Sequence, residues 1–100
     1  MTSWRTRTRQ RIDTVTASQS GLESVWLFGS AARGATPRDL DLLVVYDSDV
    51  IAPRDAHVLG DAVAAQFTEC ELRVTIILLH RSEHLSSRFA EQESAVRIWP

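Results

Sequence analysis

The sequence contains no lysine, and all eleven of its basic residues are arginine. That absence excludes a Walker-type phosphate loop ending in Gly-Lys, and it excludes a Schiff base or a covalent nucleotidyl-lysine intermediate. Whatever handles phosphate here is therefore expected to use arginine, backbone amides or a bound metal ion in place of lysine.

Cysteine is also scarce, since Cys70 is the only one in 100 residues. A single cysteine cannot form an intramolecular disulfide, which is typical of a reducing interior and predicts a cytoplasmic protein with Cys70 as a small buried side chain. Long apolar runs are missing too: the longest, Val74 to Leu79, is far below the length that crosses a bilayer, and no basic-then-apolar leader opens the chain. We therefore expect a soluble protein without membrane contact.

The overall charge favours no class of polyanionic partner, because the net charge is -2 and the isoelectric point is about 5.8. A hydrophobic content of 44% in 100 residues suits a single domain over residues 1–100. Apolar spacing and breaker residues divide this domain into alternating elements. They predict an α/β (α+β) fold, a small mixed sheet with helices packed on it. The expected helices cover about 3–18, 53–69 and 82–93, and the expected strands cover 24–28, 39–46, 71–79 and 95–99.

Two carboxylates stand at the head of the second expected strand, at Asp39 and Asp41. Alternate side chains of a strand point to the same side, so these two groups would lie about 6.5 Å apart along the strand. Such a pair is costly unless a cation balances it, and Mg²⁺ binds through one or two carboxylates and the phosphates of a substrate. The alternative is a solvated strand edge, with Asp39 capping the chain before the strand.

A Gly-Ser pair follows the first expected strand, at Gly29 and Ser30. Glycine lets a ligand approach the main chain, and the turn that begins at Ser30 would present a hydroxyl and free amides to a phosphate. Arg33, one turn further, could supply positive charge. A Gly-Ser pair alone is a weak signal, but it becomes a stronger one when Asp39 and Asp41 follow between two apolar strands.

These motifs resemble the minimal nucleotidyltransferases of the DNA polymerase beta-like superfamily. Their signature is Gly-Ser-x-Ala-Arg-Gly, a short variable stretch, and then Asp-x-Asp-Leu at the start of an apolar strand. The resemblance covers nearly the whole chain, because the order of expected elements also agrees. The matching residues are Gly29, Ser30, Ala32, Arg33, Gly34, Asp39, Asp41 and Leu42.

The resemblance implies an enzyme that transfers a nucleoside monophosphate from a triphosphate, with ATP expected, to a hydroxyl and releases pyrophosphate. Asp39 and Asp41 would then be the catalytic ligands of two Mg²⁺ (or Mn²⁺) ions. Gly29 and Ser30 would hold the phosphates, and Arg33 would offset charge near the leaving group. Small members of the family often act as antitoxins that adenylylate a tyrosine of a HEPN-type toxin, so such a protein is the expected partner, with an RNA hydroxyl as the other acceptor.

Two departures from the family pattern leave a second hypothesis open. Only eight residues, Ala31 to Arg38, separate Gly-Ser from Asp-x-Asp, where the family usually has ten. The third carboxylate of the family falls on Thr75, and Glu71 is a weak substitute because it lies about 13 Å away along an ideal strand. The alternative is therefore a catalytically degenerate module of the same fold that acts by binding a partner protein.

Three other features have ordinary structural explanations beside their functional ones. His80 and His84 have the spacing of one helix face but no third metal ligand nearby in sequence, and Trp26 is expected in the core. A run of arginines spreads round the first helix as a solvated basic face, or else contacts RNA phosphates. The run comprises Arg5, Arg7, Arg9 and Arg11.

Overall fold

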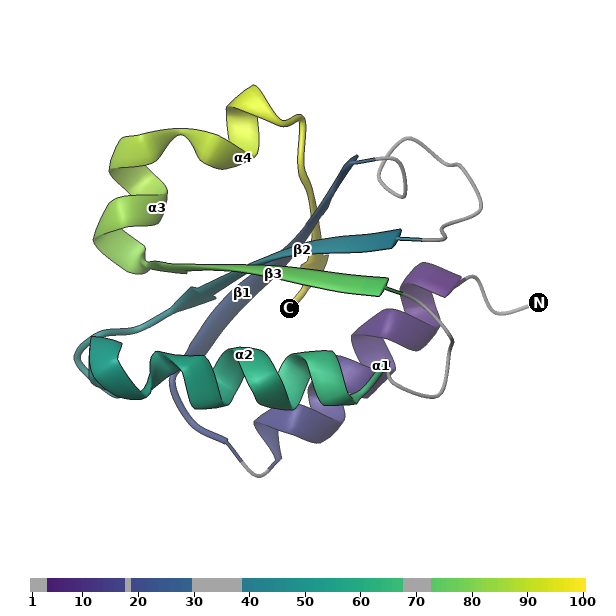
Figure 1. The fold of residues 1–100 in the computed structure, drawn as a ribbon, viewed down its shortest axis with the longest axis horizontal. Helices are drawn as coiled ribbons and strands as arrows, with labels where there is room; N and C mark the ends of the chain where they lie inside the picture. Colours follow the sequence, from purple (N-terminus) through teal and green to yellow (C-terminus); the bar gives the residue numbers. More distant parts are fainter. Residues whose placement is uncertain (1–3, 18, 30–38, 68–72) are drawn as a thin grey trace.

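A computed structural model describes residues 4–17, 19–29, 39–67 and 73–100 of the chain. In this part of the chain a four-stranded sheet has helices on both of its faces (Figure 1). The helices are α1 (Trp4–Thr16), α2 (Ala56–Ala65), α3 (Arg81–Ser87) and α4 (Phe89–Gln92), and a 3-10 turn, η2 (Pro53–Asp55), precedes α2. The strands are β1 (Leu22–Phe28), β2 (Asp39–Tyr46), β3 (Arg73–His80) and β4 (Val96–Trp99).

The sheet is mixed, with the strand order β3-β2-β1-β4. Strand β1 runs antiparallel to both of its neighbours, β2 and β4, whereas β2 and β3 are parallel. A parallel pair needs a long crossover, and α2 lies in the connection from β2 to β3. The predicted α+β class, a small mixed sheet with packed helices, is confirmed.

Strict alternation along β2 divides the interior into two clusters. Leu40, Leu42 and Val44 face α1 and α2 in the larger cluster, and β3 adds Val74, Ile76 and Leu78 to it. Leu43 and Val45 point the other way, toward α4 and the smaller cluster, which also includes Trp26, Phe28 and Ala90. Asp39 and Asp41 alternate in step with Leu43, so their side chains lie on the same face of the sheet as Leu43. Helices α3 and α4 lie on this face (Figure 1).

Helix α2 packs closely on β3 because Gly60 stands at their contact. A Cβ added to Gly60 would lie 3.2 Å from Cδ1 of Leu78, which leaves room only for glycine unless Leu78 moves. The helix also buries Ala56, Leu59 and Val63 against the sheet. This packing holds β3 beside β2.

Most predicted elements exist, but the prediction of one helix over 82–93 is wrong. The chain forms two short helices there, and they are separated by Arg88, whose backbone is left-handed with φ 58° and ψ 21°. The expected helix over 53–69 opens as η2 and its α-helical part ends at Ala65. Strand β1 begins two residues earlier than predicted, at Leu22.

Several sequence-based predictions fall on residues that the structure does not describe. They concern Ser30, Arg33, Cys70 and Glu71, together with the side chain of Arg5. Among the helices that are described, none is long and apolar enough to cross a membrane.

Candidate functional site

The two carboxylates of the Asp-x-Asp motif open β2 at the end of the sheet where β1 finishes. In the antiparallel register Asp41 pairs with Phe28, the last residue of β1, and Gly29 follows directly. Asp41 is half-buried and Asp39 is exposed, whereas the residues from Leu42 onward are buried. The motif therefore lies at the boundary between solvent and core.

Gly29 and Asp41 are in direct contact, which joins the two halves of the predicted motif. Gly29 has φ +72°, a backbone conformation that residues with a side chain rarely adopt. A Cβ added to Gly29 would overlap Oδ2 of Asp41 and lie 3.3 Å from its Cγ. From the sequence we expect a ligand to approach the main chain at Gly29, and the structure shows the Asp41 carboxylate beside it. The positive φ and this close approach both favour glycine at this position.

Strand β3 places Arg73 and Thr75 beside the two carboxylates. In the parallel register Asp39 pairs with Arg73 and Asp41 pairs with Thr75. Nε of Arg73 lies 3.8 Å from Oδ1 of Asp39, and both side chains remain largely in solvent. The residue next to Asp41 in β3 is therefore a neutral hydroxyl, and the residue next to Asp39 is a cation.

Asp39 and Asp41 are the described residues of the motif that could hold a divalent ion. Two carboxylates on one face of a strand end are hard oxygen ligands of the kind Mg²⁺ takes, with its remaining positions left to water and phosphate. In the described ranges, however, no group of three His, Cys, Asp or Glu side chains could hold a metal ion. The predicted substitute Glu71 lies outside those ranges, as do the predicted phosphate ligands Ser30 and Arg33.

The two histidines do not share a helix face, contrary to the interpretation of their spacing. His80 precedes α3 as its N-cap: its Nδ1 accepts a hydrogen bond from the amide of Glu83 at 3.2 Å, and the Glu83 side chain returns to the His80 amide. His84 instead packs on Trp26, with ring centroids 5.4 Å apart. A capping residue and a packed ring do not make a metal site.

The predicted basic face of α1 is partly used inside the fold. Arg11 donates to the backbone carbonyl of Gln66, and its guanidinium lies 5.9 Å from the ring centroid of Phe67. Arg7 and Arg9 are exposed, and Arg7 also has an interaction within the chain. Contact of this helix with RNA stays a prediction.

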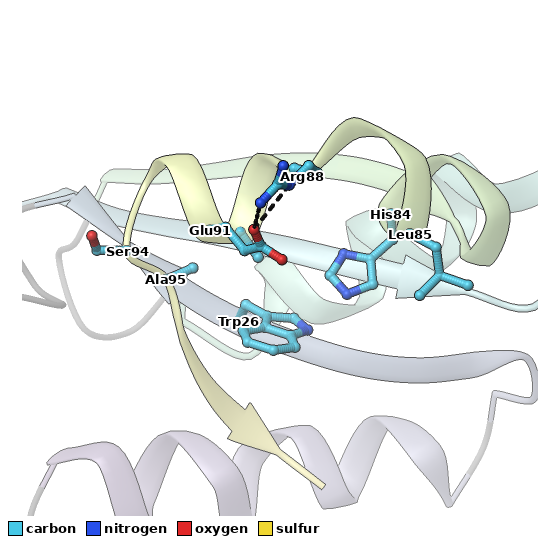
Figure 2. Close-up of a pocket in the computed structure, with 8 residues that line it drawn as sticks. Trp26, His84, Leu85, Arg88, Glu91, Ser94 and Ala95 are labelled. Atoms are coloured by element: carbon cyan, nitrogen blue, oxygen red, sulfur yellow. Dashed lines mark hydrogen bonds and ion pairs between the residues drawn. The ribbon is translucent and has the colours of Figure 1, made fainter.

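A hollow of about 280 Å³ lies on the α3–α4 side of the sheet, and the sequence motifs did not indicate it (Figure 2). Trp26 forms part of its wall and is half-buried, so it packs against the smaller cluster at the border of the core. His84 faces Trp26 across the hollow (Figure 2). Arg88 and Glu91 form an ion pair above Trp26, with 2.7 Å between Nη2 and Oε2 (Figure 2). Leu85, at the same hollow, is 72% exposed.

No protein-family model matches the chain, and no curated protein matches it either. Among solved structures, a protein from Sulfolobus solfataricus described as a "putative nucleotidyltransferase" superposes with a TM-score of 0.57. The match covers 99% of this chain and 89% of that one, at 21% sequence identity. The chain has a nucleotidyltransferase-type fold. Identity at this level establishes the architecture, and the site has to be argued from the residues themselves.

Proposed function

We propose that the protein is a Mg²⁺-dependent nucleotidyltransferase that transfers AMP from ATP to a hydroxyl group. The observation that carries the proposal is the contact between Gly29 and Asp41 at the strand end where Asp39 also stands. It supports the proposal because Gly29, the described residue of the Gly-Ser motif, lies beside Asp41 within a nucleotidyltransferase-type fold.

The residues divide the work by their chemistry. Asp39 and Asp41 would hold a divalent ion together with the phosphates of the nucleotide, and this ion would neutralise charge that develops on the leaving pyrophosphate. Gly29 has no side chain and therefore leaves room for the Asp41 carboxylate beside the main chain. Ser30 and Arg33 are the proposed phosphate ligands by resemblance.

The acceptor in this proposal is a hydroxyl of another macromolecule, with a tyrosine of a HEPN-type toxin as the leading candidate and an RNA hydroxyl as the other. The chain's own tyrosine, Tyr46, does not suit the role. Tyr46 is 5% exposed, and burial, with a smaller contribution from the charge of Glu83, raises the pKa of its phenol. A buried phenol that keeps its proton is a poor nucleophile.

Calorimetric titration of ATP tests the proposal without knowledge of the acceptor. We expect binding that requires Mg²⁺ and falls by about tenfold or more in Asp39→Asn and in Asp41→Asn, because each change removes a charged ligand of the ion. Asp61→Asn is the matched control, since Asp61 is an exposed aspartate of α2 on the opposite side of the sheet. Binding that is indifferent to Mg²⁺, or equally strong in all three variants, would contradict the proposal.

A second candidate function is a binding module that has lost transfer, and the observation in its favour is Thr75. This residue pairs with Asp41 in β3, and a threonine cannot act as the base that a third carboxylate supplies. Incubation with a purified partner and labelled ATP distinguishes the two functions. Label that reaches the partner only when this protein is present excludes the binding module, whereas a stable complex that never acquires label supports it.

A further inference from the structure

We propose that Arg73 supplies one of the positive charges of the nucleotide site, so that the site takes a single divalent ion where the family resemblance implies two. This inference rests on the proposed function and deepens it. It concerns a residue that no motif in the sequence indicated.

The first step is the arrangement of four side chains on one face of the sheet. Paired residues of adjacent parallel strands point to the same side, and neighbouring strands lie about 4.8 Å apart. Asp39 and Asp41 in β2 are therefore flanked by Arg73 and Thr75 in β3, each beside its register partner. The Arg73 guanidinium has turned to within 3.8 Å of Asp39.

The second step is electrostatic. A divalent ion bound between Asp39 and β3 would have to approach a guanidinium that already lies beside the same carboxylate. The repulsion between a +2 and a +1 charge is twice that between two monovalent cations at equal distance. The ion at this second position would also lose a carboxylate ligand, because Thr75 offers only a neutral hydroxyl.

The third step is what the guanidinium does once a nucleotide is present. Arg73 is 84% exposed, so its head is free to turn from Asp39 to an incoming phosphate. The planar, permanently charged fork of arginine matches phosphate oxygens in a way that a lone hydroxyl does not. The site would then combine a divalent ion at Asp39 and Asp41 with the permanent positive charge of Arg73 one strand away.

Electron paramagnetic resonance of bound Mn²⁺ tests this count directly. The probe is Mn²⁺ with an ATP analogue that carries a methylene group between its α- and β-phosphates, so that no turnover occurs. Two ions about 3.5–4 Å apart would couple and change the spectrum. We expect the wild-type complex to give the spectrum of uncoupled Mn²⁺, and Arg73→Asp, which adds a third carboxylate, to give a coupled pair.

The charge of Arg73 is tested by Arg73→Gln, with Arg97→Gln as the matched control. Arg97 is likewise an exposed arginine of an edge strand, on the opposite edge of the sheet. We expect Arg73→Gln to weaken binding of the analogue by about tenfold and Arg97→Gln to leave it unchanged. Circular dichroism of each variant verifies that the fold is intact.

The outcomes separate this inference from the function on which it rests. A wild-type complex that binds the analogue with a coupled Mn²⁺ pair overturns the inference and leaves the nucleotidyltransferase proposal standing. Unchanged affinity in Arg73→Gln also overturns it. A wild type that binds neither Mn²⁺ nor the analogue overturns both.

Discussion

At the scale of single residues, the candidate site depends on the contact of Gly29 with Asp41. Gly29 combines a positive φ with a position where any Cβ meets a carboxylate oxygen, so backbone conformation and packing both favour glycine. The missing side chain at Gly29 leaves the space that the Asp41 carboxylate occupies.

We expect Gly29→Ala to destabilise the protein by about 1–3 kcal/mol, as strained left-handed backbone and crowding do. In an Asp41→Ala background the same change should cost about 1 kcal/mol less, because the carboxylate that the new methyl group meets has been removed. Urea unfolding of the four proteins of this double-mutant cycle measures both values. An equal cost in both backgrounds would mean that the contact contributes nothing.

At the scale of elements, the division of the C-terminal helical segment at Arg88 shapes the cover over the site face. Arg88 adopts left-handed angles between α3 and α4, although its side chain also pairs with Glu91. The turn brings Phe89 onto Phe28. The centroids of the two rings are 5.2 Å apart, in an edge-to-face contact. Phe28 is the residue that pairs with Asp41, so the break in the helix places an aromatic contact beside the site.

We expect Arg88→Gly to be more stable than Arg88→Ala by about 1 kcal/mol, since both variants lose the ion pair and only glycine relieves the left-handed backbone. Thermal or urea unfolding measures the difference. At Asp61, an exposed position within α2, the same comparison should reverse, with glycine about 1 kcal/mol less stable than alanine. Alanine as stable as glycine at position 88 would show that the left-handed turn stores no strain.

At the scale of the whole molecule, the two faces of the sheet are covered unequally. Helix α2 has four buried residues, three of which belong to the larger cluster, whereas α3 buries none and α4 buries only Ala90. The larger cluster also includes buried residues of α1, at Ile12 and Val15. The cover over the face of Asp39 and Asp41 is therefore the weaker one.

Native-state hydrogen exchange should reveal this difference. We expect the hydrogen-bonded amides of α3 and α4 to exchange through local opening, at a free energy about 2 kcal/mol or more below that of β2. Amides of α2 should exchange close to the value of β2, which makes α2 the control for helical amides in general. Equal opening free energies in α3, α4 and β2 would show that the molecule opens as one unit.

Much of the fold follows from local patterns in the sequence. The alternation in β2, with Leu40, Leu42 and Val44 on one parity, is enough to place Asp39 and Asp41 together on the other face. This is a property of neighbouring residues, which the periodicity of a strand determines directly. The position of the third carboxylate is different, because only the family resemblance assigns it to Thr75, which pairs with Asp41 between β2 and β3.

The break at Arg88 and the place of Trp26 could not be predicted in the same way. Arginine has no preference for left-handed backbone, so the amino-acid sequence between residues 82 and 93 does not indicate a turn at Arg88. Whether a tryptophan in a buried strand reaches the core or borders a hollow depends on the helix that packs over it. Here α3 and α4 leave Trp26 half-buried beside His84.

Two properties of the candidate site follow from the amino-acid sequence alone: the chain has no lysine to offer a phosphate, and two carboxylates share one face of a strand. What stands beside those carboxylates depends on how distant parts of the chain pack. The parallel register of β2 and β3, held by the packing of α2, sets Arg73 next to Asp39 and Thr75 next to Asp41. Register between strands far apart in the chain is a property of packing, because the hydrophobic faces of both strands must meet the same helix.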